Sequence, residues 1–150
     1  MIVHTDGAAR GNPGPAGIGA VLTDEEGNVL AEHAEGIGPA TNNVAEYRAA
    51  IEGLRLAADH GAKRVLLRAD SKLLIEQLAG RFRVKNPTLQ VLHREARVLM
   101  KRFERVDLEH VRRERNKAAD RLANAGTDEW LATPDGAAYR PPDPPATLLD

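Results

Sequence analysis

Four acidic residues of this 150-residue chain stand where a carboxylate could do chemistry. Asp6 follows the apolar segment MIVHT and Asp70 ends the apolar run VLLRAD, whereas Glu46 and Asp120 border the apolar positions of expected helices. An ordinary strand-end turn would explain either aspartate taken alone. Carboxylates gathered in one place repel one another and require cations, and oxygen-only sites favour hard divalent ions such as Mg²⁺. Two such ions about 4 Å apart can clamp the attacking and leaving oxygens of a phosphoryl displacement, which is the chemistry these residue types predict.

The apolar pattern predicts the elements that must position these carboxylates. Alternating or β-branched runs indicate strands, and apolar residues three and four apart indicate helices. The predicted strands are 1–6, 17–23, 29–37, 64–70 and 106–111. The predicted helices are 43–59, 72–80 behind an N-cap at Ser71, a third one that Thr88 caps, and a last one from Asn116 to Gly126.

The order of these elements predicts how the strands pair. A strand–helix–strand crossover places two strands in parallel and is right-handed. The helix 43–59 therefore sets strand 64–70 parallel to a neighbour, and strand 1–6 is the natural neighbour because the next two strands leave its other side as a hairpin. Parallel neighbours end at the same edge of a sheet. We therefore expect Asp6 and Asp70 side by side at the carboxyl edge, where open α/β sheets place their sites.

Composition excludes several classes of function. The chain has no cysteine, which removes disulfides, thiol nucleophiles and Cys-ligated zinc, and its five aromatic residues are too few for a base-stacking platform. No apolar run approaches the roughly 18 residues of a membrane span, and the first residues lack the features of a secretory signal, so we expect a cytoplasmic protein.

Residues 127–150 hold more than half of the prolines and show no apolar periodicity. We expect them to form a tail or linker after a domain of residues 1–126.

The net charge of −1 averages over unlike parts of the chain. Residues 127–150 carry one arginine and five acidic residues, so residues 1–126 have a net charge of +3. Residues 81–121 alone hold 13 Lys and Arg against 6 Asp and Glu. A solvated helix face explains part of this excess, and phosphate binding would explain the rest. The neutral total is therefore compatible with a nucleic-acid partner.

Four blocks in this order resemble type 1 ribonuclease H, in the short prokaryotic form that lacks a basic protrusion. They are DGAARGNPGPAGIGAVL, TNNVAEYRAAIEGL, ADSKLLIEQL and VRRERNKAADRLAN, and they span about residues 1–126. The resemblance implies a ribonuclease H-like α/β fold, with a five-stranded mixed sheet of order 3-2-1-4-5 and helices on both faces. It implies that Asp6, Glu46, Asp70 and Asp120 form the catalytic quartet that binds two Mg²⁺ ions, for which Mn²⁺ can substitute. The implied reaction is hydrolysis of the RNA strand of an RNA–DNA hybrid, leaving 5′-phosphate and 3′-hydroxyl ends.

The glycine-rich turn GNPGPAG is a second candidate for function. It lacks the GK[ST] ending of a nucleotide-binding P-loop and leads into a strand rather than a helix. A tight connection between strands explains it, and close backbone approach to a nucleic-acid strand is the functional alternative. The resemblance favours the second interpretation, because it sets Gly11 and Asn12 against ribose 2′-hydroxyls, the groups that distinguish RNA from DNA.

The segment TNN before helix 43–59 and the start of the following helix complete the expected substrate-binding set. Helix capping alone explains one polar residue of TNN. The resemblance places Thr41 against a DNA-strand phosphate and Asn42 against the hybrid, and a helix N-terminus suits a phosphate in its own right. Ser71 is most simply an N-cap, while Lys72 lies at the expected mouth of the site, where it could touch the substrate backbone.

The chain departs from longer relatives in two places. The loop before Asp120 has no histidine after His110, which puts the mobile loop histidine of longer members in doubt. Arg113 is the candidate replacement, with Arg115 second, and a solvated arginine is the plain alternative. Residues 81–103 lack the clustered tryptophans of the basic protrusion, so we expect binding mainly through phosphates.

Three other hypotheses stay open on the sequence. A nuclease or strand-transfer enzyme of the same architecture could act on DNA alone, although Gly11, Asn12 and Asn42 argue against it. A non-catalytic nucleic-acid-binding module would gain nothing from clustered carboxylates. The chain also resembles the ribonuclease H half of actinobacterial bifunctional proteins with a C-terminal phosphatase, so residues 127–150 could begin a linker. We expect a monomer that binds the hybrid and no membrane.

Overall fold

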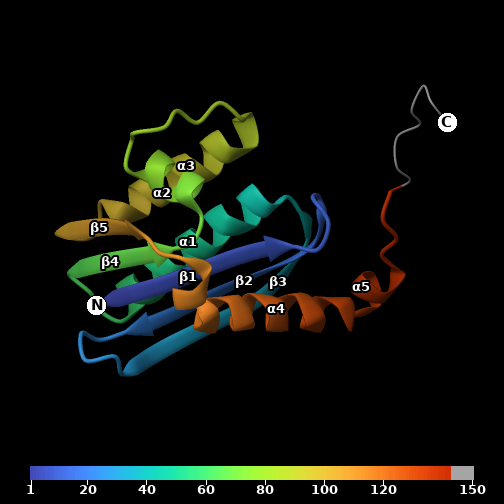
Figure 1. Ribbon diagram of the computed structural model, residues 1–150, viewed down its shortest axis with the longest axis horizontal. Helices are drawn as coiled ribbons and strands as arrows, with labels where there is room; N and C mark the ends of the chain where they lie inside the picture. Colours follow the sequence, from blue (N-terminus) through green and yellow to red (C-terminus); the bar gives the residue numbers. More distant parts are fainter. Residues whose placement is uncertain (143–150) are drawn as a thin grey trace.

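The computed structural model describes residues 1–142, and the end of the predicted tail, 143–150, lies outside the described residues. Strands and helices follow one another in the order expected of an α/β chain (Figure 1). The strands are β1 (Ile2–Ala9), β2 (Gly14–Thr23), β3 (Val29–Ala40), β4 (Arg64–Ala69) and β5 (Arg105–His110). The helices are α1 (Asn42–Asp59), α2 (Lys72–Leu78), α3 (Pro87–Met100), the short 3-10 turn η1 (Arg113–Arg115), α4 (Lys117–Leu131) and α5 (Pro134–Ala138).

The five strands form one mixed sheet in the order β3-β2-β1-β4-β5, as predicted. β1, β2 and β3 pair antiparallel, whereas β1 pairs parallel with β4 and β4 with β5. The register of β1 on β4 places Thr5 opposite Ala69. The residue after each of these is an aspartate, so the parallel pairing sets Asp6 next to Asp70 at the carboxyl edge.

Helices cover both faces of the sheet, which confirms the predicted architecture (Figure 1). On one face, α1 buries Tyr47, Ile51 and Leu54 in the same core cluster as Val3 and Leu67 of the sheet, and α2 and α3 pack beside it. On the other face, α4 packs against β2, β3 and β1. Both faces of the central strands are thus buried, which explains the nearly continuous burial of β2.

Helix α4 lies unusually close to its face of the sheet, because glycines line that face. A Cβ atom at Gly17, Gly19 or Gly36 would collide with backbone carbonyls of α4. Residues on β2 alternate between faces, so Gly17 and Gly19 point to α4 while Ile18 and Ala20 point to the α1 side. The first turn of α4, which carries Asp120, is therefore held against β1 and β2.

Several element boundaries differ from the predictions. Asn86, not Thr88, caps α3, since its side chain accepts a hydrogen bond from the Leu89 amide and Pro87 follows at the first helical position. The last helix does not end at Gly126 but continues to Leu131, where Trp130 packs over Gly36 and Gly38. Part of the predicted tail thus belongs to the folded body.

None of the helices within 1–142 combines the length and the apolar character needed to cross a bilayer.

Candidate active site

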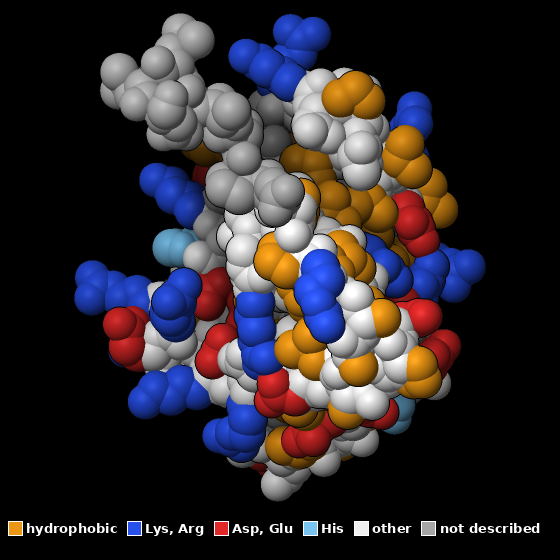
Figure 2. Space-filling view, turned by 90° about the vertical axis from the view of Figure 1, so that its right-hand side faces the viewer, with side chains coloured by type: hydrophobic (Ala, Val, Ile, Leu, Met, Phe, Trp, Pro, Cys, Tyr) orange, Lys and Arg blue, Asp and Glu red, His pale blue; other side chains and the backbone are white. Residues whose placement is uncertain are grey.

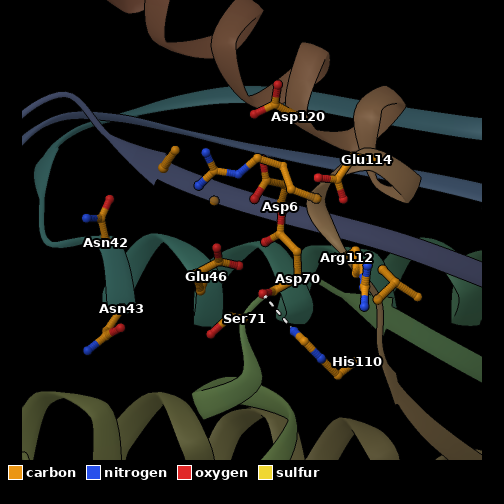
Figure 3. A pocket seen from close by; sticks show the side chains of 14 residues that line it. Asp6, Asn42, Asn43, Glu46, Asp70, Ser71, His110, Arg112, Glu114 and Asp120 are labelled. Carbon is orange, nitrogen blue, oxygen red and sulfur yellow. Dashed lines mark hydrogen bonds between the residues drawn. The ribbon is translucent and has the colours of Figure 1, made fainter.

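Three carboxylates converge at the carboxyl edge of the sheet. Asp6 of β1, Glu46 of α1 and Asp70 after β4 each offer an oxygen within 4.8 Å of the others'. Figure 3 shows the three side chains directed toward one another, with Asp120 approaching Asp6 from α4. The sequence-based prediction that these acids meet is in agreement with this placement.

A close contact between β1 and α1 brings Glu46 to this edge. Gly7 follows Asp6, and a Cβ atom there would collide with the Ala45 carbonyl and lie 2.6 Å from the Glu46 amide nitrogen. The strand and the helix therefore touch backbone to backbone at Gly7, which positions the neighbouring Glu46 beside Asp6. The Gly7 backbone beside the Glu46 carboxylate acts to lower the pKa of Glu46, against the larger opposite effect of burial.

Asp120 reaches the cluster from the opposite face of the sheet. It is half-buried in the first turn of α4, and its carboxyl group is near enough to that of Asp6 to contribute to the raised pKa of Asp6. Asn116, one turn earlier, pins this end of the helix: its buried Nδ2 donates to the Thr5 carbonyl at 2.9 Å. The residue before Asp6 and the turn before Asp120 are thereby joined directly.

The electrostatics of the cluster oppose ionisation of all its members. Burial, the charge of Asp70 and the nearby carboxyl group of Asp120 raise the pKa of Asp6 to about 7. Burial raises the pKa of Glu46 well above its ordinary value, and the charges of Asp6 and Asp70 raise it further. Within residues 1–142 none of the four acids forms an ion pair with Lys, Arg or His. The site is therefore short of positive charge.

These features fit a divalent cation. The Glu46 Oε2 atom is buried without a hydrogen-bond partner, which is costly unless something binds it. The donors are carboxylate oxygens, the type that Mg²⁺ and Mn²⁺ favour, with no thiolate and no histidine among them. Asp6, Glu46 and Asp70 could hold such an ion, with Asp120 on the Asp6 side.

A pocket of about 600 Å³ opens over the carboxylates. Besides the four acids, polar residues of four different segments line it, namely Asn42, Asn43, Ser71, His110, Arg112, Arg113 and Glu114. Asn42, Ser71 and Arg113 of the predicted substrate-binding set thus lie in the pocket wall. Gly11, Asn12, Thr41 and Lys72 do not line this pocket.

Two hydrogen bonds join the β1–β2 turn to the start of α1 beside the pocket. The Asn42 side-chain oxygen accepts a hydrogen bond from the Ala9 amide at 2.8 Å, and the Asn12 side-chain oxygen accepts one from the Asn42 amide at 3.1 Å. Both side-chain NH₂ groups are consequently left to donate elsewhere. Thr41 and Ser71 are N-caps, accepting from the amides of Val44 and Leu74.

Sequence reasoning missed His110, Asn116 and Glu114. His110 pairs with Ala69 in register and its Nε2 lies 3.2 Å from the Asp70 carbonyl oxygen (Figure 3). The parallel pairing of the last two strands could have revealed it, since both strands end at the same edge. Asn116 was predicted to begin the last helix, but its side chain makes no capping bond and donates to the Thr5 carbonyl of β1 instead.

Comparison with known proteins gives consistent matches over most of the chain. A family model described as reverse transcriptase-like matches residues 4–126. The bifunctional protein Rv2228c of Mycobacterium tuberculosis is 50% identical over 129 residues, which cover 85% of this chain and 35% of that protein. Ribonuclease HI of Halobacterium salinarum is 45% identical over 126 residues, covering 84% of this chain and 63% of the relative. The chain therefore spans about a third of the mycobacterial relative and less than two thirds of the archaeal one.

A relative matched over most of its length and a solved structure are also similar to this chain. Ribonuclease H of Chromohalobacter salexigens is 35% identical over 152 residues, covering 88% of this chain and 87% of that protein. A solved structure of LC11-RNase H1 in complex with RNA/DNA hybrid superposes with a TM-score of 0.83 at 43% identity. It covers 87% of this chain and 99% of that chain.

Proposed function

Because the chain belongs to the ribonuclease H family, we propose that it is an endonuclease that hydrolyses the RNA strand of RNA–DNA hybrids. The observation that carries this proposal is the convergence of Asp6, Glu46, Asp70 and Asp120 at one pocket without a compensating cationic side chain. A binding module for phosphates would not retain such a repulsive cluster. The structure of a similar protein with an RNA/DNA hybrid supports the hybrid as substrate.

We infer two-metal-ion catalysis with Mg²⁺, for which Mn²⁺ can substitute, leaving 5′-phosphate and 3′-hydroxyl ends. When bound, the two ions would activate the attacking water and stabilise the leaving oxygen. The role of the protein is then to hold its carboxylates in place, and the bound ions would favour the deprotonated forms of Asp6 and Glu46. The strands fix Asp6 and Asp70, the Gly7 contact fixes Glu46, and α4 brings Asp120.

Asn12 and Asn42 would read the RNA strand as hydrogen-bond donors. Their side-chain oxygens are already occupied within the protein, so their NH₂ groups face outward with a defined polarity. A ribose 2′-hydroxyl can accept such a bond, and deoxyribose cannot. Gly11 has a φ of 92° and presents bare backbone beside Asn12, which permits a nucleic-acid strand to come close.

Phosphate contacts would come from the helix starts and from the loop before α4. We propose that Thr41 at the start of α1 contacts a DNA-strand phosphate, and that Ser71 and Lys72 contact the backbone near the cut. Arg113 lies in the pocket wall, which supports its proposed part in substrate binding in place of a loop histidine. His110 lies near Asp70 on the same wall and is a further candidate.

The decisive experiment combines carboxylate variants with a panel of nucleic acids. Asp6→Asn and Asp70→Asn are expected to abolish Mg²⁺-dependent cleavage of a labelled hybrid while the protein stays folded. Asp59→Asn, which changes an exposed aspartate at the end of α1, should cleave normally. Retained Mg²⁺-dependent cleavage by either site variant would contradict the proposal. Cleavage of double-stranded DNA in preference to the hybrid would favour a DNA nuclease of the same architecture instead.

We further propose a cytoplasmic monomer and, in the natural protein, a second domain after this one. The match to 35% of a protein named bifunctional supports the second domain. We propose a catalytic domain of residues 1–126 followed by a Pro-rich tail or linker of 127–150. The end of α4 and the whole of α5 lie within 127–150, so the first part of that segment is helical. Gel filtration and the length of the natural reading frame test these points.

A further inference from the structure

Asp120 is held differently from the other three carboxylates. Asp6, Glu46 and Asp70 form the tight group whose oxygens lie within 4.8 Å, and strand pairing or a backbone contact fixes each of them. Asp120 stands on a helix at the rim of the pocket and is half-buried. Something must set its carboxylate against three other acids that repel it.

The neighbour of Asp120 on the same helix face is Asn124, one turn later. The Asn124 Nδ2 atom lies 3.1 Å from the Asp120 carbonyl oxygen and 3.5 Å from the carboxylate Oδ1. The side-chain NH₂ group thus points at Asp120 and presents a positive dipole end to its carboxylate. This orientation depends on what holds the other end of the amide.

Arg10 holds that other end. Its Nη2 donates to the Asn124 side-chain oxygen at 3.3 Å and to the Asn124 carbonyl at 3.4 Å, while its Nη1 donates to Asp128 at 2.6 Å. Asp120, Asn124 and Asp128 are four residues apart and so share one face of α4. Arg10 therefore spans two turns of this face and fixes the Asn124 amide with its NH₂ group toward Asp120.

Arg10 also begins the turn that carries Gly11 and Asn12. Its backbone amide closes this turn by donating to the Pro15 carbonyl at 2.8 Å. One side chain thus connects the turn proposed to read ribose with the helix that carries the fourth carboxylate.

We infer that Arg10 and Asn124 are positioning residues that set the carboxylate of Asp120 for divalent-cation binding, Arg10 acting through Asn124. This inference rests on the proposed function, which supplies the hybrid used in the kinetic test, but the quantity it predicts is the affinity for the divalent cation. Partners of metal-ligating side chains typically contribute about 10- to 100-fold to metal affinity or activity. Asn124, which touches Asp120, is expected to matter more than Arg10.

The test measures Mn²⁺ binding to the whole chain by titration calorimetry, without nucleic acid. Asn124→Ala should weaken binding about 10-fold, and Arg10→Met should weaken it less. The double variant should bind no more weakly than Asn124→Ala alone, because the effect of Arg10 passes through Asn124. Arg55→Met is the matched control: Arg55 is 47% exposed against 43% for Arg10 and bonds two acids, Glu52 and Glu95, each at 2.6 Å. It should bind Mn²⁺ like the wild type.

Steady-state cleavage separates positioning from a merely structural role. Positioning lowers kcat and raises the Mn²⁺ concentration needed for half-maximal rate. If Arg10→Met raises only KM for the hybrid and leaves Mn²⁺ affinity unchanged, Arg10 shapes the turn alone and the inference is overturned. Losses that multiply in the double variant, or an unaffected Asn124→Ala, overturn it as well. Failure of the proposed function is distinguishable, since the wild type would then bind Mn²⁺ without cleaving the hybrid.

Discussion

Burial raises the pKa of both Asp6 and Glu46 above that of an ordinary carboxyl group, and the charges of neighbouring acids raise it further. A divalent ion needs these groups deprotonated, so protons and metal compete for the same oxygens. Protonation of Asp6 and Glu46 therefore makes both metal binding and the stability of the fold depend on pH. The sign of the stability effect follows from the direction of the pKa shift.

The stability of the metal-free protein should depend on pH through Asp6. A carboxyl group whose pKa rises from 3.8 to about 7 on folding binds more protons in the folded state between these values. The free energy of unfolding therefore falls as the pH rises through this range. Asp6→Asn mimics the protonated form, so its melting temperature in EDTA should exceed that of the wild type increasingly from pH 5 to pH 8. A constant difference across this range would contradict the raised pKa, and saturating Mn²⁺ should stabilise the wild type preferentially.

Asn116 is expected to matter for both stability and activity. Its Nδ2 is the partner of the Thr5 carbonyl at 2.9 Å in a fully buried place. Asn116→Ala should lower the free energy of unfolding by about 1–3 kcal/mol, since it removes a buried hydrogen bond. It should also reduce kcat, because the start of α4 loses its anchor beside Asp6.

Asn86→Ala is the matched control for Asn116→Ala. Asn86 caps α3 away from the carboxylates, so its loss should cost about 1 kcal/mol in urea denaturation and leave kcat unchanged. Equal kcat values for the two variants would show that Asn116 only stabilises the fold.

The identities of the four carboxylates could be predicted from the sequence, but their environment could not. Strand ends and helix positions next to apolar residues indicated Asp6, Glu46, Asp70 and Asp120. The depth of their burial depends on how closely α1 and α4 approach the sheet. Asn116 shows the limit most clearly, because a polar residue before a helix has the same sequence signal whether it caps the helix or bonds to a distant strand.

At the scale of elements, the glycines under α4 determine where Asp120 lies. Gly19 pairs with Asp6 across β1 and β2, and a Cβ atom there would lie 2.7 Å from the Ala123 amide nitrogen of α4. Gly19, which lies opposite Asp6, therefore also contacts the helix that carries Asp120. A side chain at Gly19 would push α4 outward.

Gly19→Ala should therefore lower stability and weaken metal binding together. We expect a loss of about 1–3 kcal/mol in the free energy of unfolding, from overpacking, and a clear loss of Mn²⁺ affinity as Asp120 moves from Asp6. Gly27→Ala is a control with a stability loss of similar size but different origin, since Gly27 has a φ of 89°, which strains an alanine, and nothing lies within 4 Å of the added Cβ. Calorimetric Mn²⁺ titrations should detect a defect in the first variant and none in the second.

The order and pairing of the elements could be predicted, whereas some of their ends could not. The crossover rule and the hairpin sufficed to place β1 between β2 and β4 and to predict the meeting of Asp6 with Asp70, whereas the full order 3-2-1-4-5 followed from the resemblance to ribonuclease H. The predicted end of the last helix at Gly126 was wrong. The prolines and small residues after Gly126 obscured a helical spacing that continues from Ala123 to Trp130. Trp130 packs over Gly36 and Gly38 of β3. This contact forms only once the sheet is assembled, so the local sequence does not reveal it.

At the scale of the whole molecule, the near-zero net charge conceals a separation of charge. Lys and Arg side chains gather at the left of the face in Figure 2, around a group of acidic side chains. The ten-residue stretch 112–121, which forms the loop before α4 and its first turns, holds five cationic residues, namely Arg112, Arg113, Arg115, Lys117 and Arg121. Within the part of the chain that the structure describes, none of them forms an ion pair, whereas Arg55, Arg64 and Arg105 do. Cations without acidic partners beside the site are suited to backbone phosphates.

Salt should therefore weaken hybrid binding steeply, and Arg113 should contribute to the slope. Each phosphate that a cationic side chain neutralises adds about 0.7–0.9 to the slope of log affinity against log salt concentration. In an Asp70→Asn background, which is expected to bind without cleaving, Arg113→Gln should reduce this slope by roughly that amount between about 50 and 300 mM salt. Arg64→Gln serves as control, because Arg64 begins β4 at the opposite edge of the sheet and pairs with Glu104. Fluorescence anisotropy of a labelled hybrid measures both slopes, and equal slopes for the two variants would remove Arg113 from the phosphate-binding surface and leave it a solvated arginine.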